Sequence, residues 1–198
     1  MRFAVPEGAT PIEDTEGLIP DIVTLADLNA VEAENILLAE DRHLRRRKPA
    51  DAGWLDEAFL RALHGDMLGD VWDWAGTYRH KELTIGVEPA LVHEEIGKLL
   101  GDFRYWQTLK PGDMSILERA VRLHHKLVWI HPFRNGNGRH ARMTADVYLH
   151  SQRHALPVWP ADVGGAGEAR KRYVAALKAA DGGDYAPLTD FVRGRIPA

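Results

Sequence analysis

Apolar residues recur at the spacing of an α-helix along most of the chain. The first such stretch follows Thr24-x-x-Asp27, which can cap a helix, and it continues to about Arg47, where Pro49 stops it. We therefore predict a helix over about residues 24–47. Its predicted apolar stripe consists of Leu25, Leu28, Val31, Ile36 and Leu37.

Later segments show the same period. The predicted helices cover about residues 54–68, 90–107, 115–130, 136–153, 166–180 and 184–195. The helix over 54–68 has one apolar face, made of Leu55, Phe59, Leu63 and Met67. The helix over 115–130 begins with the capping box Ser115-x-x-Glu118. Its predicted buried stripe is Ile116, Ala120, Leu123, Leu127 and Ile130.

The period changes over residues 72–87. This segment contains aromatic residues, Gly76 and a strand-like run at 83–85, and it predicts a short β-hairpin or flap. Residues 1–23 are rich in proline, glycine and acidic side chains, so we expect an arm there rather than a regular element. No repeat or linker divides the remainder. The sequence predicts an all-α fold, a single helical domain over 24–198 with one small hairpin.

Composition narrows the classes of function. The 198 residues are 45% hydrophobic and 27% charged, with a formal net charge of -4, which does not favour nucleic-acid binding through overall charge. The absence of cysteine excludes disulfides, thiolate metal sites and cysteine nucleophiles, and it fits a reducing compartment. We find no signal peptide and no run approaching the roughly 20 apolar residues that span a bilayer. We expect a cytoplasmic protein that binds neither nucleic acid nor a membrane.

Residues 131–142 carry the strongest chemical signal, and they read His-Pro-Phe-Arg-Asn-Gly-Asn-Gly-Arg-His-Ala-Arg. Two glycines in a loop that opens a helix let the backbone approach a ligand closely, and a helix N-terminus favours an anion. Arg139 and Arg142 share a helix face near that end, where two guanidiniums can clamp a phosphate. His131 directly precedes the loop and could take a proton from an incoming hydroxyl. The segment therefore predicts a phosphate site beside a general base.

This segment resembles the motif of the Fic family, His-x-Phe-x-(Asp/Glu)-Gly-Asn-Gly-Arg-x-x-Arg. The matching residues are His131, Phe133, Gly136, Asn137, Gly138, Arg139 and Arg142. Upstream, residues 74–79 (Trp-Ala-Gly-Thr-Tyr-Arg) and the later Ile85-Gly86 are similar to the family's flap. The likeness covers about residues 20–195. Within the family it is greatest to the bacterial group called mobile mystery protein B.

The resemblance implies a helical bundle with a flap, and an enzyme that moves AMP from ATP to a Ser, Thr or Tyr hydroxyl of a protein. His131 would act as the general base, and Phe133 would anchor the loop in the core. A target segment would pair with the flap in the manner of a strand. The residues implied for that pairing are Thr84, Ile85, Gly86 and Val87.

The resemblance also implies how the nucleotide is held. The amides from Gly136 to Gly138 would bind the diphosphate, and Asn137 would support them. Arg139 would pair with the β-phosphate. Arg142 would pair with the γ-phosphate.

Asn135 stands where the family usually has Asp or Glu to bind Mg²⁺. An amide oxygen can contact the ion but supplies no negative charge, and Mg²⁺ prefers carboxylates and phosphates. The neighbouring Arg134 adds positive charge. Two interpretations stay open: the nucleotide phosphates and water hold the metal, or a different phosphate-containing group is transferred.

Fic proteins often carry an inhibitory helix, Ser/Thr-x-x-x-Glu-Gly/Asn, whose Glu pairs with the second arginine of the motif. Glu34 fits the end of this pattern because an Asn follows it, but Ala30 stands where Ser or Thr belongs. Glu32 has Leu28 at that place. We expect one of the two carboxylates to contact Arg142. The alternative is a charged, solvated helix face.

Other histidine and tryptophan residues invite weaker interpretations. The adjacent His124 and His125 are poorly spaced for a metal pair on one helix face, so we expect one to pack in the core and one to lie at the surface. Most of the six tryptophans are expected to pack in the core or at an interface.

Three functions stay open. AMP transfer leads, removal of such a group is the second enzymatic alternative, and a degenerate fold that binds a nucleotide or partner without turnover is the third. The intact His131 favours an enzyme over the third alternative. The resemblance further implies a helix-turn-helix partner protein in a toxin–antitoxin-like setting, and it leaves an oligomer open.

Overall fold

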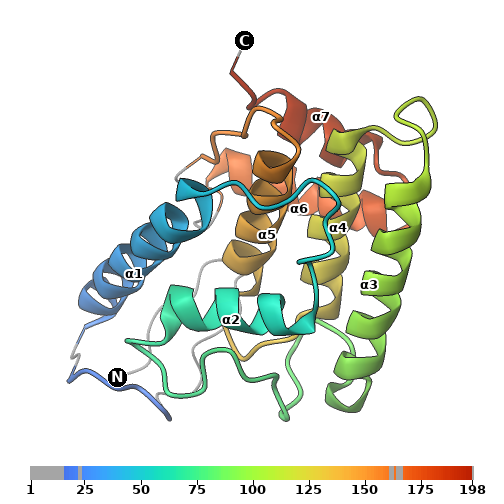
Figure 1. Ribbon diagram of the computed structural model, residues 1–198. Coiled ribbons are helices and arrows are strands. Elements are labelled where there is room, and N and C mark those ends of the chain that lie inside the picture. Colours follow the sequence, from blue (N-terminus) through green and yellow to red (C-terminus); the bar gives the residue numbers. More distant parts are fainter. Residues whose placement is uncertain (1–15, 22–23, 161–162, 164–166, 198) are drawn as a thin grey trace.

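The computed structural model describes residues 16–21, 24–160, 163 and 167–197. Figure 1 shows the helices formed there: α1 (Leu25–Arg45), α2 (Glu57–Leu68), the 3-10 turn η1 (Pro89–Leu91), α3 (Val92–Thr108), α4 (Ile116–Ile130), α5 (Asn137–Ser151), α6 (Glu168–Asp181) and α7 (Ala186–Arg193). Within the described ranges there is no regular β-strand, and the predicted all-α class is confirmed. None of the helices described combines the length and apolar character that a bilayer crossing demands.

Side-chain caps fix two of the predicted helix starts. The Thr24 hydroxyl accepts a hydrogen bond from the backbone N–H of Asp27 at 3.1 Å, and the Ser115 hydroxyl accepts one from that of Glu118, also at 3.1 Å. Such a cap satisfies one of the N–H groups that the first helical turn leaves without a partner. Consequently α1 and α4 begin where the sequence predicts.

The helix that carries the second half of the motif, α5, lies in the middle of the molecule (Figure 1). It contacts α4, α2 and α1, while α3, α6 and α7 pack against α4. The core beside α5 includes the buried rings of Tyr148, Phe103 and Tyr173. Segments that are far apart in the sequence therefore surround the motif helix.

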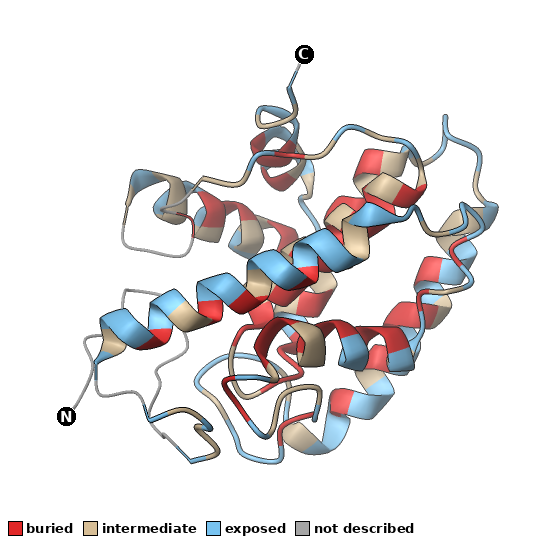
Figure 2. Cartoon of the chain, turned by 60° about the vertical axis from the view of Figure 1, so that its left-hand side comes forward, coloured by how far each residue is buried: buried red, intermediate tan, exposed pale blue. Residues whose placement is uncertain are grey.

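The buried face of α1 differs from the predicted stripe. Its buried residues are Leu28, Glu32, Asn35 and Ala39. The prediction is wrong for Leu37, which is 65% exposed. Figure 2 shows much of α1 coloured as exposed, with buried positions along one side of the helix. A stripe drawn through apolar residues alone misses this face, because Glu32 and Asn35 occupy two of its inner positions.

Residues 72–87 do not form the predicted β-hairpin. Their backbone bonds to the start of the motif loop instead: the N–H of Arg79 donates to the Pro132 carbonyl at 2.9 Å, and that of Val87 donates to the Ile130 carbonyl at 3.3 Å. Donors engaged in this way cannot pair across a hairpin. We call residues 79–87 the flap, since they lie against the motif without any strand ladder of their own.

Of the predicted N-terminal arm over 1–23, only residues 16–21 lie within the described part of the chain. That short piece runs antiparallel to the chain that follows α2. Leu18 forms an isolated β-bridge with Trp72. The backbone N–H of Ile19 donates to the carbonyl just before that tryptophan at 2.8 Å.

His124 and His125 are both buried, which corrects the expectation that one of them lies at the surface. Nε2 of His124 is 2.7 Å from the Tyr173 hydroxyl, and Nε2 of His125 is 2.9 Å from the Asp181 carboxylate. α6 supplies both partners, so the two adjacent rings hold this helix against α4. In the described ranges, no three His, Cys, Asp or Glu side chains gather as metal ligands.

Candidate active site

The C-terminus of α4 places His131. This residue has a left-handed backbone, with φ 54° and ψ 60°, so the chain leaves the helix there in a sharp turn. Nδ1 lies 3.1 Å from the Val128 carbonyl oxygen and donates its hydrogen to it, which leaves the lone pair on Nε2. Burial lowers the pKa of His131 to about 4. The imidazole is therefore neutral near pH 7 and can accept a proton at Nε2.

Asn137 braces the loop that follows. Its Oδ1 accepts the N–H of Phe133 at 2.8 Å, and its Nδ2 donates to the carbonyl of the same residue at 2.8 Å. The Phe133 ring is fully buried and stacks on the His64 ring, with centroids 3.7 Å apart. Asn137 is itself 2% exposed, so its amide shapes the loop from within.

His64 of α2 is a site residue that the sequence analysis missed. Its Nδ1 accepts the N–H of Gly76 at 3.0 Å, and its Nε2 donates to the Asn135 carbonyl at 3.0 Å. Burial lowers the pKa of His64 to about 3, with the nearby His140 as a second cause, so the ring is neutral. A neutral ring with one donor and one acceptor ties the chain before the flap to the motif loop. The only signal in the sequence was a polar residue on the apolar face of α2.

Gly136 opens α5 with a left-handed backbone, φ 74°. A β-carbon there would lie 2.6 Å from the Leu68 side chain. The left-handed backbone and this close contact each require glycine at the position. Gly136 also offers no side-chain cap to the helix. The first N–H groups of a helix have no partner within the helix, and here they open beside two arginines. The amides of Asn137 and Gly138 are thus suited to an anion, whereas the predicted third donor, the Gly136 N–H, already donates to Asn135 Oδ1 at 2.7 Å.

Arg139 is held by a carboxylate from α1. Its guanidinium donates to Glu32 Oε2 at 2.6 Å, and the other oxygen of Glu32 accepts the indole N–H of Trp72 at 2.7 Å. Glu32 is 2% exposed, whereas Glu34 is exposed on the outer side of α1. The expectation that one of the two contacts Arg142 is therefore wrong. The buried carboxylate belongs to Glu32, and its partner is the first motif arginine.

Arg142 has aromatic neighbours. Its guanidinium carbon lies 5.6 Å from the ring centroid of Trp159 and 6.0 Å from that of Tyr173. The side chain is only partly buried. The two motif arginines thus have different surroundings, a carboxylate for Arg139 and flat rings for Arg142.

Arg79 joins the flap to His131. Its Nε donates to the His131 carbonyl oxygen at 2.7 Å, one Nη donates to the Lys81 carbonyl at 3.1 Å, and the other donates to the Val87 carbonyl. The residue is 2% exposed. The buried Arg79 guanidinium donates its hydrogen bonds to backbone carbonyls and so has a structural role. It fixes both ends of the flap relative to His131.

Gly86 lies directly against His131. It has φ +103°, and a β-carbon at this position would be 2.6 Å from the His131 β-carbon. The adjoining Thr84 and Ile85 are exposed, while Val87 is partly buried. The tip of the flap therefore presents open backbone next to the imidazole.

The residues present do not fit a protein-held Mg²⁺ ion. Asn135 Oδ1 accepts the N–H of Gly136 at 2.7 Å, so its oxygen is turned back onto the loop. The neighbouring Arg134 stacks over Trp74, at 5.4 Å from guanidinium carbon to ring centroid, and brings positive charge. Mg²⁺ is usually bound through carboxylates, and this loop offers none.

The Fic/DOC family matches residues 54–149, a range that includes α2, the flap and the whole motif segment. Among curated proteins, the chain is 33% identical over 119 residues to the protein adenylyltransferase Fic of Nematostella vectensis, covering 60% of this chain and 26% of that protein. It is 30% identical over 119 residues to the protein adenylyltransferase fic-1 of Caenorhabditis briggsae, covering 60% and 22%. The chain spans about a quarter of the length of these relatives.

Solved structures share the fold. The BepC protein of Bartonella tribocorum, a VirB-translocated effector solved with bound AMPPNP, superposes with a TM-score of 0.66 at 20% identity, covering 98% of this chain and 95% of that one. Fic-1 of C. elegans gives a TM-score of 0.65 at 22% identity, covering 90% of this chain and 51% of that one. All the residues of the candidate site between His64 and Arg142 lie inside the matched range. Residues 54–149 of this chain are therefore similar to the Fic/DOC family.

Proposed function

We propose that the chain is a protein adenylyltransferase, which moves AMP from ATP to a hydroxyl of a protein. One arrangement carries this proposal: a neutral imidazole with its lone pair on Nε2 precedes an uncapped helix N-terminus that bears two arginines. The adenylyltransferase names of the relatives support the same reaction.

The reaction follows from this arrangement. A Ser, Thr or Tyr hydroxyl oxygen attacks the α-phosphorus of ATP, and His131 Nε2 takes the hydroxyl proton. The bond between the α-phosphorus and the bridging oxygen breaks, and diphosphate leaves. Its charge is stabilised by the first amides of α5 and by the motif guanidiniums, Arg139 on the β-phosphate and Arg142 on the γ-phosphate. The product is AMP esterified to the protein.

The flap supplies a place for the target. Thr84 and Ile85 are exposed, and Gly86 brings the backbone against His131. An extended segment of the target can pair with this open backbone, which places its hydroxyl near the imidazole. Because Asn135 does not make a metal site, we propose that any Mg²⁺ is held by the nucleotide phosphates and water.

Labelled nucleotides test the reaction. We expect label from α-labelled ATP to enter protein, no label to enter from γ-labelled ATP, and His131→Ala to abolish the signal, because the base that removes the hydroxyl proton is lost. His93→Ala is a matched control, since His93 is an exposed histidine near the start of α3, outside the flap and the motif. Label from the γ position alone would show phosphate transfer, and release of AMP from a modified protein would show the reverse reaction. The absence of any label would favour a binding module.

We further propose that Glu32 is a brake on this site. Its carboxylate accepts a hydrogen bond from the Arg139 guanidinium at 2.6 Å, and the Trp72 indole N–H donates to the same carboxylate at 2.7 Å. A β-phosphate would compete for that guanidinium, and it would bring its own charge close to the carboxylate. ATP therefore binds productively only when Glu32 releases Arg139.

Removal of the carboxylate tests the brake. We expect Glu32→Gly to raise auto-modification at least about tenfold, because one charge-assisted hydrogen bond no longer competes with the phosphate. Glu34→Gly is the matched control, since it changes an exposed carboxylate two residues away. Equal rates of label incorporation in Glu32→Gly and the unchanged protein would refute the brake.

The cellular setting is a separate part of the proposal. Likeness to the mobile mystery protein B group supports a bacterial, cytoplasmic enzyme that works with a helix-turn-helix partner in a toxin–antitoxin-like pair. Co-expression with the neighbouring open reading frame, followed by co-purification and a growth assay, tests this. Growth arrest by Glu32→Gly that the partner relieves is the expected result.

A further inference from the structure

Arg142 lies beside an aromatic residue that is outside the motif and outside the range that the Fic/DOC family matches. Trp159 sits 5.6 Å from the guanidinium carbon of Arg142, within the distance at which a cation is attracted to an aromatic face. This tryptophan follows α5 in an extended segment of chain. It reaches back over the helix that carries the arginine.

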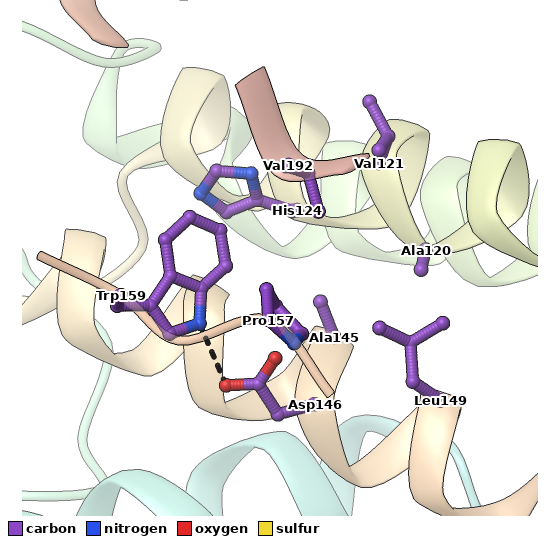
Figure 3. A pocket seen from close by; sticks show the side chains of 9 residues that line it. All are labelled: Ala120, Val121, His124, Ala145, Asp146, Leu149, Pro157, Trp159 and Val192. Atoms are coloured by element: carbon purple, nitrogen blue, oxygen red, sulfur yellow. Dashed lines mark hydrogen bonds between the residues drawn. The ribbon is translucent and has the colours of Figure 1, made fainter. Parts of the chain in front are cut away.

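The orientation of Trp159 is fixed by Asp146. The indole N–H donates to Asp146 Oδ2 at 2.8 Å, as Figure 3 shows. Asp146 lies four residues after Arg142 on α5, so the two side chains share one face of that helix. The same helix thus carries the arginine and the group that orients the ring beside it.

A second ring, that of His124, packs against Trp159. His124 of α4 lies against Trp159, with ring centroids 5.6 Å apart, and Figure 3 shows the two side chains next to each other. His124 is in turn bonded to the hydroxyl of Tyr173, the other aromatic neighbour of Arg142. Trp159 is therefore held by a hydrogen bond at its nitrogen and by packing at its ring.

Asp146 can hold the indole without capturing the arginine. Burial raises the pKa of its carboxyl to about 8, against opposing effects of Trp159 and Arg142, so the group is mostly neutral at pH 7. A neutral carboxyl still accepts the indole N–H but does not attract the Arg142 guanidinium as a carboxylate would. The positive charge stays available for a ligand.

We propose that Trp159, oriented by Asp146, is a positioning residue that holds Arg142 ready for the terminal phosphate of a nucleoside triphosphate. The inference rests on the proposed function and adds a determinant of nucleotide selectivity, triphosphate over diphosphate. Side chains on a helix lean towards its N-terminus, and a guanidinium guided by a flat ring keeps that direction. Without the ring, Arg142 samples more rotamers and binds the γ-phosphate less often.

Binding of AMPPNP and ADP to the full chain, measured by calorimetry in the Glu32→Gly background, tests the proposal. We expect Trp159→Leu to weaken AMPPNP about three- to tenfold, the range that a cation–π contact supports, and to weaken ADP less than about twofold. Asp146→Leu should give the same selective loss of AMPPNP affinity. Asp146→Asn should keep the AMPPNP affinity of the unsubstituted position, because the amide oxygen of Asn still accepts the indole N–H. Trp54→Leu is the matched control, since this indole donates to the Pro49 carbonyl away from the arginine.

A double-mutant cycle separates positioning from packing. In an Arg142→Ala background, Trp159→Leu should cause no further loss of AMPPNP affinity, because the ring acts through the arginine. Equal loss of AMPPNP and ADP affinity, or loss that persists in the Arg142→Ala background, would overturn the proposal. Should Trp159→Leu fail to fold, Trp159→Phe keeps an aromatic face, loses the indole donor and is expected to show a smaller selective loss. Failure of the parent protein to bind either nucleotide would instead count against the proposed function.

Discussion

At the scale of single residues, burial selects the protonation state that the proposed chemistry needs. The backbone of α4 turns left-handed at His131, and the Val128 carbonyl takes the hydrogen on Nδ1. Burial, with the nearby Arg79 as a lesser cause, lowers the pKa of this imidazole to about 4. An ordinary exposed histidine would be partly charged at pH 6.5 and could not accept a proton in that form.

The pH dependence of transfer follows from this shift. His131 is an active base only when neutral, so we expect the rate to be lost as pH falls through about 4, and not through the ordinary histidine value of 6.5. The measurement is kcat/KM for label incorporation between about pH 4 and pH 8, with circular dichroism at each pH to confirm that the protein is folded. A decline of activity centred near pH 6.5 in folded protein would contradict the assignment.

At the scale of elements, the flap is positioned by its contacts with the motif and not by internal pairing. Arg79 holds both ends of the flap through carbonyl oxygens, and Gly86 brings the tip against His131. A strand ladder would fix the flap by itself, whereas this flap depends on the loop it serves. Its geometry and that of the base are therefore coupled.

Substitution at Gly86 tests that coupling. A β-carbon there would overlap the β-carbon of His131, and φ +103° is unfavourable for alanine. We expect Gly86→Ala to slow target modification about tenfold or more, because a small displacement of reacting groups has a large effect on rate. The affinity for ATP should change little. Gly97→Ala on α3 is the control, since a β-carbon added there would meet nothing within 4 Å apart from its chain neighbours and the backbone of its own helix. Unchanged kcat in Gly86→Ala would show that the flap moves independently of the base.

At the scale of the whole molecule, local pattern predicts the helices and the motif, but not which distant groups meet them. Hydroxyl caps and apolar periods fixed the starts of α1 and α4. Periodicity could not show that Glu32 faces inwards, because its burial depends on Arg139 and Trp72, which lie far along the chain.

The same limit applies to the network around α5. His64 is a polar residue on a largely apolar helix, and its two hydrogen-bond partners, Gly76 and Asn135, reach it only in the folded chain. Asp146 and Trp159 are joined across a turn of the chain whose path no local rule determines. Contacts between neighbouring residues follow from local chemistry, while these contacts follow from the packing of the helices.

Buried ionisable groups also determine how the whole fold responds to acid. Burial lowers the pKa of four histidines to about 3 or about 4: His64, His124, His131 and His140. Below pH 6.5 the unfolded chain binds protons that the folded chain refuses, so stability falls as pH decreases. Asp146 acts in the opposite sense, because its raised pKa of about 8 means that folding retains a proton, and that contribution is lost as pH rises through 8.

Between pH 6.5 and 4 the histidines outnumber Asp146, so we expect the free energy of unfolding to decrease steadily on acidification. Each buried histidine contributes up to about 2 kcal/mol of this loss by pH 5, since its proton must bind to the unfolded state alone. Urea unfolding at several pH values measures the slope, which reports the number of protons taken up. His124→Gln should reduce that slope by about one proton, since the substituted side chain no longer takes up a proton on unfolding. A slope near zero in the parent protein would mean that water reaches these rings in the folded state, and then the neutral form of His131 would not be a consequence of the fold.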